Sequence, residues 1–597
     1  MGSTGADNDD ISLSVNARKV LERRYLLKDE EGRIIESPRA MFRRVAKAVA
    51  EADLLYNEGQ NTKKLEEEFF RLMTNLEFLP NSPTLMNAGT EIGQLSACFV
   101  LPVGDSIREI FDAVKNMALI HQSGGGTGFS FSRLRPKDDV VKSTGGIASG
   151  PLSFMRVFDE ATEIIKQGGR RRGANMGILR VDHPDIVDFI RAKERRGFLN
   201  NFNISINATD LFMESLKANG KYDLVNPRTG KVTKTMRAKQ VFGRAVRSAW
   251  KTGDPGFLFI DEINRYNPTP LLGEIESTNP CGEQPLLPYE SCNLGSINLS
   301  KMVRDGTIDW EKLKRTVHLG IHFLDNIIDV NKFPLPEIEA ITKGNRKIGL
   351  GVMGFAEMVI QLGISYASDE ALEVAERAME YIQREAIAKS MDLAQWRGSF
   401  PNFKGSLWEQ RGYERMRNAS ITTIAPTGTL SIIADTSSGI EPLFAISFYR
   451  EILEGTTLLE VNSLFQSLAE DEGIAGKELM ERIALKGSIQ DLPSVPDSLK
   501  RTFLTALDIP YGWHIKMQAA FQKYTDNAVS KTVNLPHEAS IEDVARAYLM
   551  AYERKCKGIT IFRYGSKHHQ VLYVGLSKDK PVQAGPEFSG DCRICSV

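Results

Sequence analysis

The chain has few cysteines, almost no net charge and no long apolar run. Its six cysteines are too few to hold 597 residues together through disulfides, which leaves them as candidates for chemistry. The 75 basic and 76 acidic residues nearly cancel, which argues against nucleic acid or a membrane surface as a partner. No apolar stretch reaches the ~20 residues of a membrane helix, and the polar segment 1–10 does not resemble a signal peptide. We therefore expect a cytoplasmic protein.

Common ligand-binding motifs are missing or incomplete. There is no Walker A motif and no repeat of 20–50 residues. The segment from Gly349 to Gly354 matches the dinucleotide-binding pattern, but residues 341–347 are too polar for the buried strand that such a site requires. A tightly packed turn is therefore favoured. His318 and His322 are four residues apart, but the glutamate of the H-E-x-x-H motif is absent, which favours a helix-surface pair over zinc. We predict no metal site.

Three regions follow from the hydrophobic pattern. Residues 1–79 contain apolar side chains at 3–4 spacing, typical of amphipathic helices. Residues 80–570 alternate short apolar runs, polar loops and amphipathic helices, which indicates an α/β fold. Residues 571–597 lose this periodicity and are expected to form a flexible tail that contains Cys592 and Cys595. Two cysteines supply only half of a structural zinc site, so a redox dithiol is favoured there.

The most informative segment runs from Ser277 to Pro285 and includes Asn279, Cys281 and Glu283. Residues two apart in an extended segment point the same way, so the thiol and the carboxylate can face one pocket. A nearby carboxylate raises the pKa of a thiol, and no local cation offsets it, so an ionic nucleophile is disfavoured. One-electron chemistry at sulfur beside a carboxylate base fits the pair. The segment alone leaves a buried structural cysteine with a surface glutamate equally open.

Several blocks together resemble the ribonucleotide reductase family over nearly the whole chain. They are residues 80–89, residues 96–100, the Asn-Pro-Cys-Gly-Glu segment 279–283, residues 291–296 and residues 425–431, in the family's order and at similar spacings. The resemblance implies an α/β fold, a ten-stranded α/β barrel of two five-stranded halves. A finger loop is expected inside the barrel, after an N-terminal helical region. Only about ten polar residues precede the first expected helix, so no ATP-cone domain is expected.

The resemblance also implies catalytic roles. Cys281 would carry the thiyl radical that abstracts the ribose 3′ hydrogen, Glu283 would be the base on the 3′ hydroxyl, and Asn279 would bind the substrate hydroxyls. Cys98 and Cys292 would form the dithiol that reduces the 2′ position. The spacing of six cysteines could not have paired them, because it allows many pairings.

After each turnover the active-site pair would need a new supply of electrons. The resemblance implies that Cys592 and Cys595 re-reduce it by thiol–disulfide exchange. Thioredoxin or a similar dithiol donor would then reduce the tail.

Two nucleotide sites are implied as well. The substrate site would use a Thr/Gly/Ser loop that presents N–H groups and hydroxyls to phosphate, and its expected residues are Ser82, Thr84, Ala97, Pro426, Thr427, Gly428, Thr429 and Ser431. A dNTP or ATP effector would bind at a second site, with expected residues Asp105, Ser106, Ile107, Arg135, Gln167, Arg170, Arg171 and Arg172. Taken alone, the first loop could be an ordinary turn, and the arginine run a solvated turn or an unspecified anion site.

The family members differ in how the thiyl radical is made. The chain has no Tyr-Tyr dipeptide for radical transfer from a second subunit and no C-terminal glycyl-radical motif. Residues 279–285 and 529–536 resemble the adenosylcobalamin-dependent class, although the Asp-x-His-x-x-Gly motif of other cobalamin enzymes is absent. The candidate cofactor-binding residues are Gly351, Val352, Met353, Gly354, Val533, Asn534, Leu535 and Pro536.

The leading hypothesis is an effector-regulated homodimer that reduces ribonucleotides, expected to be diphosphates, with adenosylcobalamin. One alternative is the catalytic subunit of a two-subunit reductase that obtains its radical from a metal-containing partner. An alternative of another class is a nucleotide-binding regulator that kept the fold and lost catalysis. Retention of five expected cysteines, of Glu283 and of Asn279 argues against the last hypothesis.

The radical hypothesis predicts that Cys281→Ser abolishes turnover, because a hydroxyl cannot replace the thiol as hydrogen-atom carrier. Binding of effector nucleotides should be unchanged, since the effector site is separate. Steady-state assays and equilibrium dialysis on the same preparation would measure both properties. Substantial residual turnover in this variant would contradict the assignment.

Overall fold

The computed structural model describes residues 11–141, 145–167, 171–195, 197–453, 456–566, 572–573 and 583–584. Cys592, Cys595 and Arg170 therefore lie outside the described residues. The expected helical region is present as α1 (Val15–Arg24), α2 (Pro38–Ala50) and α3 (Thr62–Thr74). The side chains of Ser14, Ser37 and Asn61 accept hydrogen bonds from backbone N–H groups of the first turns, which explains where the helices begin.

A ten-stranded mixed sheet organises the rest of the molecule. Five strands are mutually parallel: β2 (Cys98–Leu101), β3 (Gly126–Ser130), β8 (Asn175–Arg180), β9 (Phe202–Ala208) and β12 (Gly256–Phe259). They form the first half of the sheet. Their glycines and apolar residues are buried on both faces, as expected for parallel strands covered by helices.

The second half runs in the opposite direction. It contains β15 (Glu290–Asn298) parallel to β18 (Ile348–Met353), and β21 (Thr532–Leu535) parallel to β22 (Gly558–Arg563). The short strand β1 (Phe78–Pro80) is antiparallel to β15. Antiparallel pairing joins the halves at β2–β15 and at β12–β22. Between β18 and β21 two isolated parallel bridges, Leu350–Thr422 and Ile424–Val529, link the backbone.

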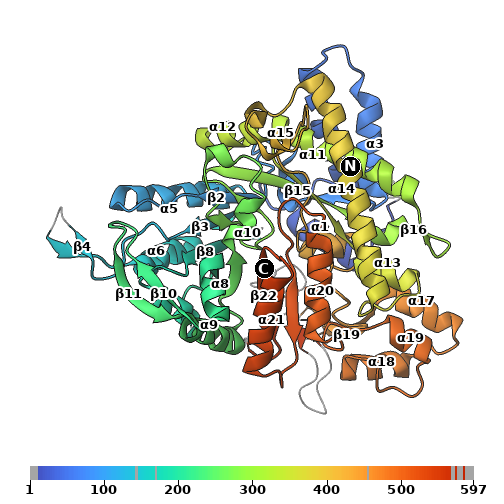
Figure 1. Cartoon of the computed structure of the whole chain (residues 1–597). Coiled ribbons are helices and arrows are strands. Elements are labelled where there is room, and N and C mark those ends of the chain that lie inside the picture. The colour runs from blue at the N-terminus through green and yellow to red at the C-terminus, as the bar shows by residue number, and fades with distance from the viewer. Residues whose placement is uncertain are drawn as a thin grey trace.

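Helices cover the outside of the sheet (Figure 1). On the first half lie α5 (Ile107–Gln122) and α6 (Pro151–Ile164), which pack against each other and against a core of phenylalanines that includes Phe129, Phe131 and Phe158. The second half is covered by α11 (Trp310–Val330), α14 (Asp369–Arg397) and the N-terminal helices, which share one large apolar core. Among the described residues, no helix is both long and apolar enough to span a membrane.

A buried cluster of charged side chains joins the helical region to the segments that carry the site. Asp325 of α11 contacts Arg346, Arg397 and Arg417, and all four side chains are at most 5% exposed. Arg397 also pairs with Asp53 of the N-terminal region. Burial opposes ionisation of Asp325, but the three arginines outweigh it and hold its pKa well below the usual range. The cluster therefore fixes residue 346, just before β18, and residue 417, just before the 420–424 segment.

Asp325→Asn should lower the free energy of unfolding by about 3–5 kcal/mol, because it leaves buried arginine charges without their shared partner. Urea denaturation followed by circular dichroism would measure the change. The pKa of Asp325 is depressed in the folded state, so the wild-type advantage should persist above about pH 4 and shrink as the pH falls further. Asp497→Asn is the matched control, since this side chain is fully exposed and its substitution should leave the free energy of unfolding nearly unchanged.

Candidate active site

A short hairpin presents the Asn-Pro-Cys-Gly-Glu segment. It connects β13 (Ser277–Thr278) to β14 (Pro285–Leu286), which pair antiparallel. Asn279 closes the loop: its N–H donates to the carbonyl of Gln284 over 3.2 Å, and its Oδ1 accepts from the N–H of Gln284 over 3.0 Å. Gly282 has a φ of +81°, a backbone conformation that glycine adopts without strain. The local sequence thus folds into a tight tip that carries Cys281.

This finger loop lies inside the sheet, between its two halves. On the first half, a Cβ added to Gly128 would lie 1.7 Å from the carbonyl oxygen of Thr278, so β3 approaches the loop more closely than any side chain permits. On the opposite side, the Thr423 hydroxyl and the Ala528 N–H both donate to the Glu283 carbonyl over 2.9 Å. The loop is held from both directions.

Cys98 and Cys292 face each other directly below the loop. They are register partners across β2 and β15, one from each half of the sheet. The Asn279 Nδ2 donates to the Cys98 sulfur over 3.1 Å, and the Cys98 thiol contacts Glu283 Oε1 at 3.9 Å. Four of the five predicted catalytic side chains therefore converge in one buried place. Cys281 lies at the tip of the loop and is partly exposed.

The environment keeps the Cys292 sulfur protonated. Its side chain is fully buried, and burial raises the pKa of the thiol well above the usual value. The thiol donates to the carbonyls of Asn293 and Lys347. Behind it, Lys347 and Glu290 form a fully buried ion pair at 2.7 Å, and their charges act on the thiol in opposite directions. A neutral thiol is suited to donate hydrogen rather than to attack as a thiolate.

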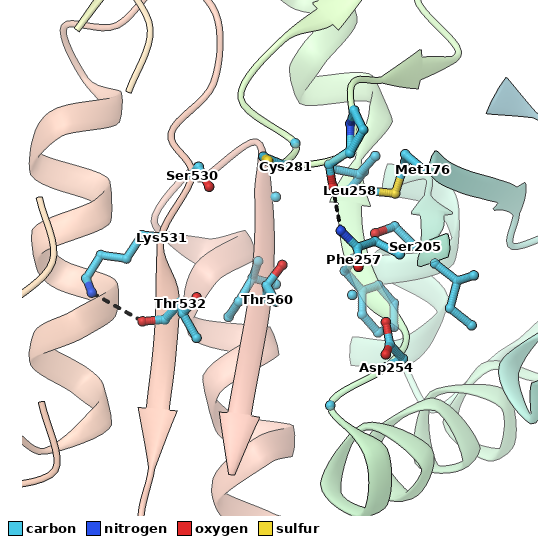
Figure 2. Close-up of a pocket in the computed structure, with 18 of the residues that line it drawn as sticks. Met176, Ser205, Asp254, Phe257, Leu258, Cys281, Ser530, Lys531, Thr532 and Thr560 are labelled. Carbon is cyan, nitrogen blue, oxygen red and sulfur yellow. Dashed lines mark hydrogen bonds between the residues drawn. The ribbon is translucent and has the colours of Figure 1, made fainter. Parts of the chain in front are cut away.

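A cavity opens beside Cys281 (Figure 2). It is lined by residues of β9, β12, β22 and β21, which are consecutive neighbours in the sheet, together with the tip of the finger loop. Figure 2 shows Cys281 at one end of the cavity near Ser530, with Thr532 and Thr560 farther along it. Its lining mixes apolar and polar side chains, including Met176, Phe257, Leu258, Ser205, Asp254, Ser530, Thr532 and Thr560.

The cavity is suited to a nucleoside group, because apolar walls can sandwich a base while scattered hydroxyls and a carboxylate meet the sugar. Gly256 belongs to this lining and is closely packed: a Cβ there would lie 3.0 Å from the Ile559 carbonyl and 3.1 Å from the Ser205 hydroxyl. The residues present thus fit the adenosyl part of an adenosylcobalamin. Apart from Cys281, sequence reasoning missed this lining, since its residues come from five strands and several loops and share no local motif.

The cofactor residues predicted from the sequence do not line this cavity. Gly351, Val352, Met353 and Gly354 lie in or just after β18, which is buried throughout, and a Cβ on Gly351 would lie 2.2 Å from the Thr423 carbonyl. The glycines of this segment therefore allow close packing. This agrees with the sequence analysis, which favoured a tightly packed turn over a dinucleotide-binding site. Along β21 the cavity lining reaches Thr532, one residue before the second set, which is Val533, Asn534, Leu535 and Pro536. Both sets stay predictions.

The expected phosphate loop begins next to the cysteine pair. Ala425 and Ala97 pack in one apolar cluster with Cys98 and Cys292. The loop then passes through Pro426 and Thr427, which has a φ of +52°, into α16 (Gly428–Ala434), which contains Thr429 and Ser431. The Thr427 hydroxyl accepts from the Gly439 N–H over 2.7 Å, which anchors the turn.

The two expected residues from the 80–89 block have different surroundings. Ser82 is half-buried, and its hydroxyl lies 2.7 Å from the Tyr25 hydroxyl. Thr84 is fully buried, and its hydroxyl lies within hydrogen-bond distance of two acceptors, the Leu95 carbonyl and Asn81 Oδ1. Its hydroxyl is thus already engaged within the protein.

The expected effector residues lie around the start of α5. Arg135 donates to the Asp105 carboxylate from its backbone N–H and from Nε, both over 2.9 Å. The Ser106 side chain caps α5, and Ile107 is 62% exposed. In the arginine run, Gln167 belongs to β6 (Lys166–Gln167), which pairs with β7 (Arg171–Arg172). The structure thus brings Asp105 and Arg135 together.

The two histidines at 3–4 spacing have separate partners. His318 Nε2 lies 3.1 Å from a Glu385 oxygen, and His322 Nε2 lies 2.9 Å from an Asp53 oxygen. Each imidazole is thus paired with a different carboxylate. In the described part of the chain, no three His, Cys, Asp or Glu side chains gather as metal ligands.

Comparisons with known proteins agree with this geometry. Residues 96–562 match the model of the ribonucleotide reductase barrel domain, and residues 11–93 match that of the ribonucleotide reductase all-alpha domain. The chain belongs to the ribonucleotide reductase family. This membership confirms the resemblance first seen in the Asn-Pro-Cys-Gly-Glu segment and its companion blocks.

Two curated relatives of this reductase are very similar along most of their length. A vitamin B12-dependent ribonucleoside-diphosphate reductase of Thermoplasma acidophilum is 51% identical, covering 96% of this chain and 82% of the relative. One of Mycobacterium tuberculosis with the same name is 49% identical, covering 98% and 85%. The solved class Id alpha subunit of Actinobacillus ureae has a TM-score of 0.77 over 93% of this chain and 97% of that one, and its 24% identity supports the fold alone.

Gly128→Ala should reduce ribonucleotide reduction by about 100-fold or more, because the added methyl displaces Thr278 and with it the finger loop. Steady-state assays would measure the loss, and circular dichroism would show that the fold persists. Gly243→Ala is the control: it lies in α9 (Ala238–Thr252), and its nearest neighbour is 4.0 Å away. Activity of Gly128→Ala equal to that of the control would contradict the role of this close approach.

Proposed function

We propose that the chain reduces ribonucleoside diphosphates to 2′-deoxyribonucleoside diphosphates with adenosylcobalamin as radical source. The observation that carries the proposal is the placement of Cys98 opposite Cys292, beneath a loop that carries Asn279, Cys281 and Glu283. Two relatives named as B12-dependent ribonucleoside-diphosphate reductases, about half identical to this chain, support the substrate class and the cofactor.

When bound, adenosylcobalamin supplies the one-electron oxidation that turns the Cys281 thiol into a thiyl radical. Cys281 then takes the hydrogen atom from the ribose 3′ carbon and returns it to the same carbon at the end. Glu283 accepts the proton of the 3′ hydroxyl, which promotes departure of the 2′ hydroxyl as water. Asn279, rigidly closed on its own loop, would orient the ribose hydroxyls.

Cys98 and Cys292 supply the reducing equivalents. Together their thiols give two electrons and two protons, one proton leaving in the water that forms, and a disulfide replaces the two S–H bonds. Burial keeps the Cys292 thiol protonated before the reaction, which matches this demand. The overall balance is one ribonucleotide and one dithiol converted to one deoxyribonucleotide, one disulfide and water. A tail dithiol, Cys592 and Cys595, and a thioredoxin-like donor would restore the pair.

The substrate and effector sites follow the expected loops. Residues 426–431 enter a turn whose backbone N–H groups suit a diphosphate, and Ala97 packs in one cluster with Ala425 just before them. We expect Ser82 to contribute as well. Asp105 and Arg135 offer an acceptor and a cation beside α5 for a dNTP or ATP effector, with Arg171 and Arg172 on the neighbouring hairpin. We expect the present ion pair of Asp105 and Arg135 to open when the nucleotide binds.

A homodimer is the oligomer that we propose. The first half of α5 exposes Ile107 and Phe111, which are 62% and 50% exposed, and Leu119 on the same helix is 40% exposed. Apolar side chains at this exposure on one helix are typical of a face that another subunit covers. We also propose a cytoplasmic location, because thiol reduction requires a reducing compartment.

The decisive experiment is anaerobic reduction of CDP by the purified chain with dithiothreitol and effectors, with and without adenosylcobalamin. We expect dCDP only with the cofactor, accompanied by a Co(II) signal in electron paramagnetic resonance. Activity that requires a second, metal-containing protein instead would favour the two-subunit alternative. Nucleotide binding with no turnover under either condition, for CDP and CTP alike, would favour the regulator alternative.

A further inference from the structure

A buried chain of hydrogen bonds links four elements on one side of the sheet. His121, in the last turn of α5, lies with Nε2 2.9 Å from the Thr127 hydroxyl of β3. Thr127 donates to Asn175 Oδ1 of β8 over 2.7 Å, and Asn175 Nδ2 donates to the Thr162 hydroxyl of α6 over 2.8 Å. Thr162 finally donates to the Phe158 carbonyl over 2.8 Å. None of these side chains takes part in the proposed chemistry.

The direction of every hydrogen bond in this chain is fixed. The single proton of Thr127 goes to Asn175, so its oxygen must accept from His121, which sets the imidazole as the Nε2–H tautomer. The four side chains are at most 4% exposed, and the elements that carry them contribute residues to the phenylalanine core. In such surroundings water cannot replace a lost partner, so the network holds a single arrangement.

The network contacts the segments on both sides of the arginine hairpin, which is formed by β6 and β7. Helix α6 ends at Ile164, two residues after Thr162, and the hairpin strands β6 and β7 follow. The chain then reaches Gly173 and re-enters the sheet at Asn175. A Cβ on Gly173 would lie 2.4 Å from the His121 Nδ1, so the exit of the hairpin rests on the imidazole. One hydrogen-bonded chain thus joins the entry and the exit of the hairpin to α5.

The same network lies beside the finger loop. Thr127 follows Gly126, which is the register partner of Cys98. A Cβ on Gly126 would lie 2.9 Å from Pro280 Cγ, so β3 touches the loop at this point. At the other end of α5 are Asp105 and Ser106, the candidate effector residues. Figure 1 shows α5, α6, β3 and β8 together on this side of the sheet.

We propose that His121, Thr127, Asn175 and Thr162 form a positioning network that couples α5 to the arginine hairpin and so transmits effector identity to substrate choice. This inference rests on the proposed function. The physical reason is that a shift of α5 moves His121, and the fixed hydrogen bonds then carry both ends of the hairpin with it. Without the network, α5 could move while the hairpin stays in place.

The test compares Thr127→Val, which removes the hydroxyl but keeps a β-branched side chain, with Thr127→Ser, which keeps the hydroxyl. CDP and GDP compete for the holoenzyme, without effector and with dATP, dGTP or dTTP in turn. We expect wild type and Thr127→Ser to change the CDP/GDP ratio of kcat/KM by about tenfold or more with effector, a size typical of allosteric coupling. In Thr127→Val the ratio should stay within about twofold of its effector-free value. Effector Kd, from equilibrium dialysis, should change less than about threefold.

A second pair tests the other end of the network. Thr162→Val removes the hydroxyl that accepts from Asn175, and Thr162→Ser keeps it. This pair is decisive if Thr127→Val does not fold. The same contrast within this pair supports the proposal. A valine variant that keeps the wild-type effector response, or that loses effector binding itself, overturns the coupling role. A further outcome is that wild type reduces CDP while no nucleotide changes its CDP/GDP ratio. That result would contradict both the proposed effector site and the coupling role, and it would leave the proposed catalysis supported.

Discussion

The site depends on a loop that passes between two halves of one sheet. A loop fits between the two halves only where the facing strand has residues without side chains. In β3 these residues are Gly126 and Gly128. The close approach of β3 sets the position of Thr278 and Pro280, and through them the reach of Cys281. The opposite half holds the Glu283 carbonyl with two donors. A thiyl radical at Cys281 would therefore be positioned by the close packing of its loop against β3 and by the hydrogen bonds that hold Glu283.

The two halves must also stay in register, because each supplies one cysteine of the pair. Cys98 comes from β2 and Cys292 from β15, and only the antiparallel seam between these strands places them opposite each other. The buried arginine and aspartate cluster around Asp325 supports the second half from behind. It fixes the residues that lead into β18 and into the 420–424 segment, so charges buried outside the sheet also help to position the candidate phosphate loop that follows.

The cysteine sulfur atoms differ in their exposure, which suits them to different roles. Cys281 borders a cavity, as a residue that must meet a cofactor requires, whereas Cys292 is sealed and neutral. The polar groups behind Cys292, Lys347 and Glu290, pair with each other. Their charges act on the thiol in opposite directions, and burial is the main reason why its pKa is raised. The same principle of buried, fully directed hydrogen bonds appears again at His121 and Thr127, where it serves rigidity rather than chemistry.

The sequence by itself determined the family, the helical start, the α/β texture and the identity of the reactive segment, because these depend on local periodicity and on short blocks in a fixed order. Cys281 and Glu283 were readable as neighbours, since both belong to one loop. Only the tertiary structure placed Cys98 opposite Cys292, gathered the cavity lining from five strands and several loops, and connected His121 to both ends of the arginine hairpin. Those relations join residues tens to hundreds of positions apart, and strand register and burial, which no local pattern encodes, decide them.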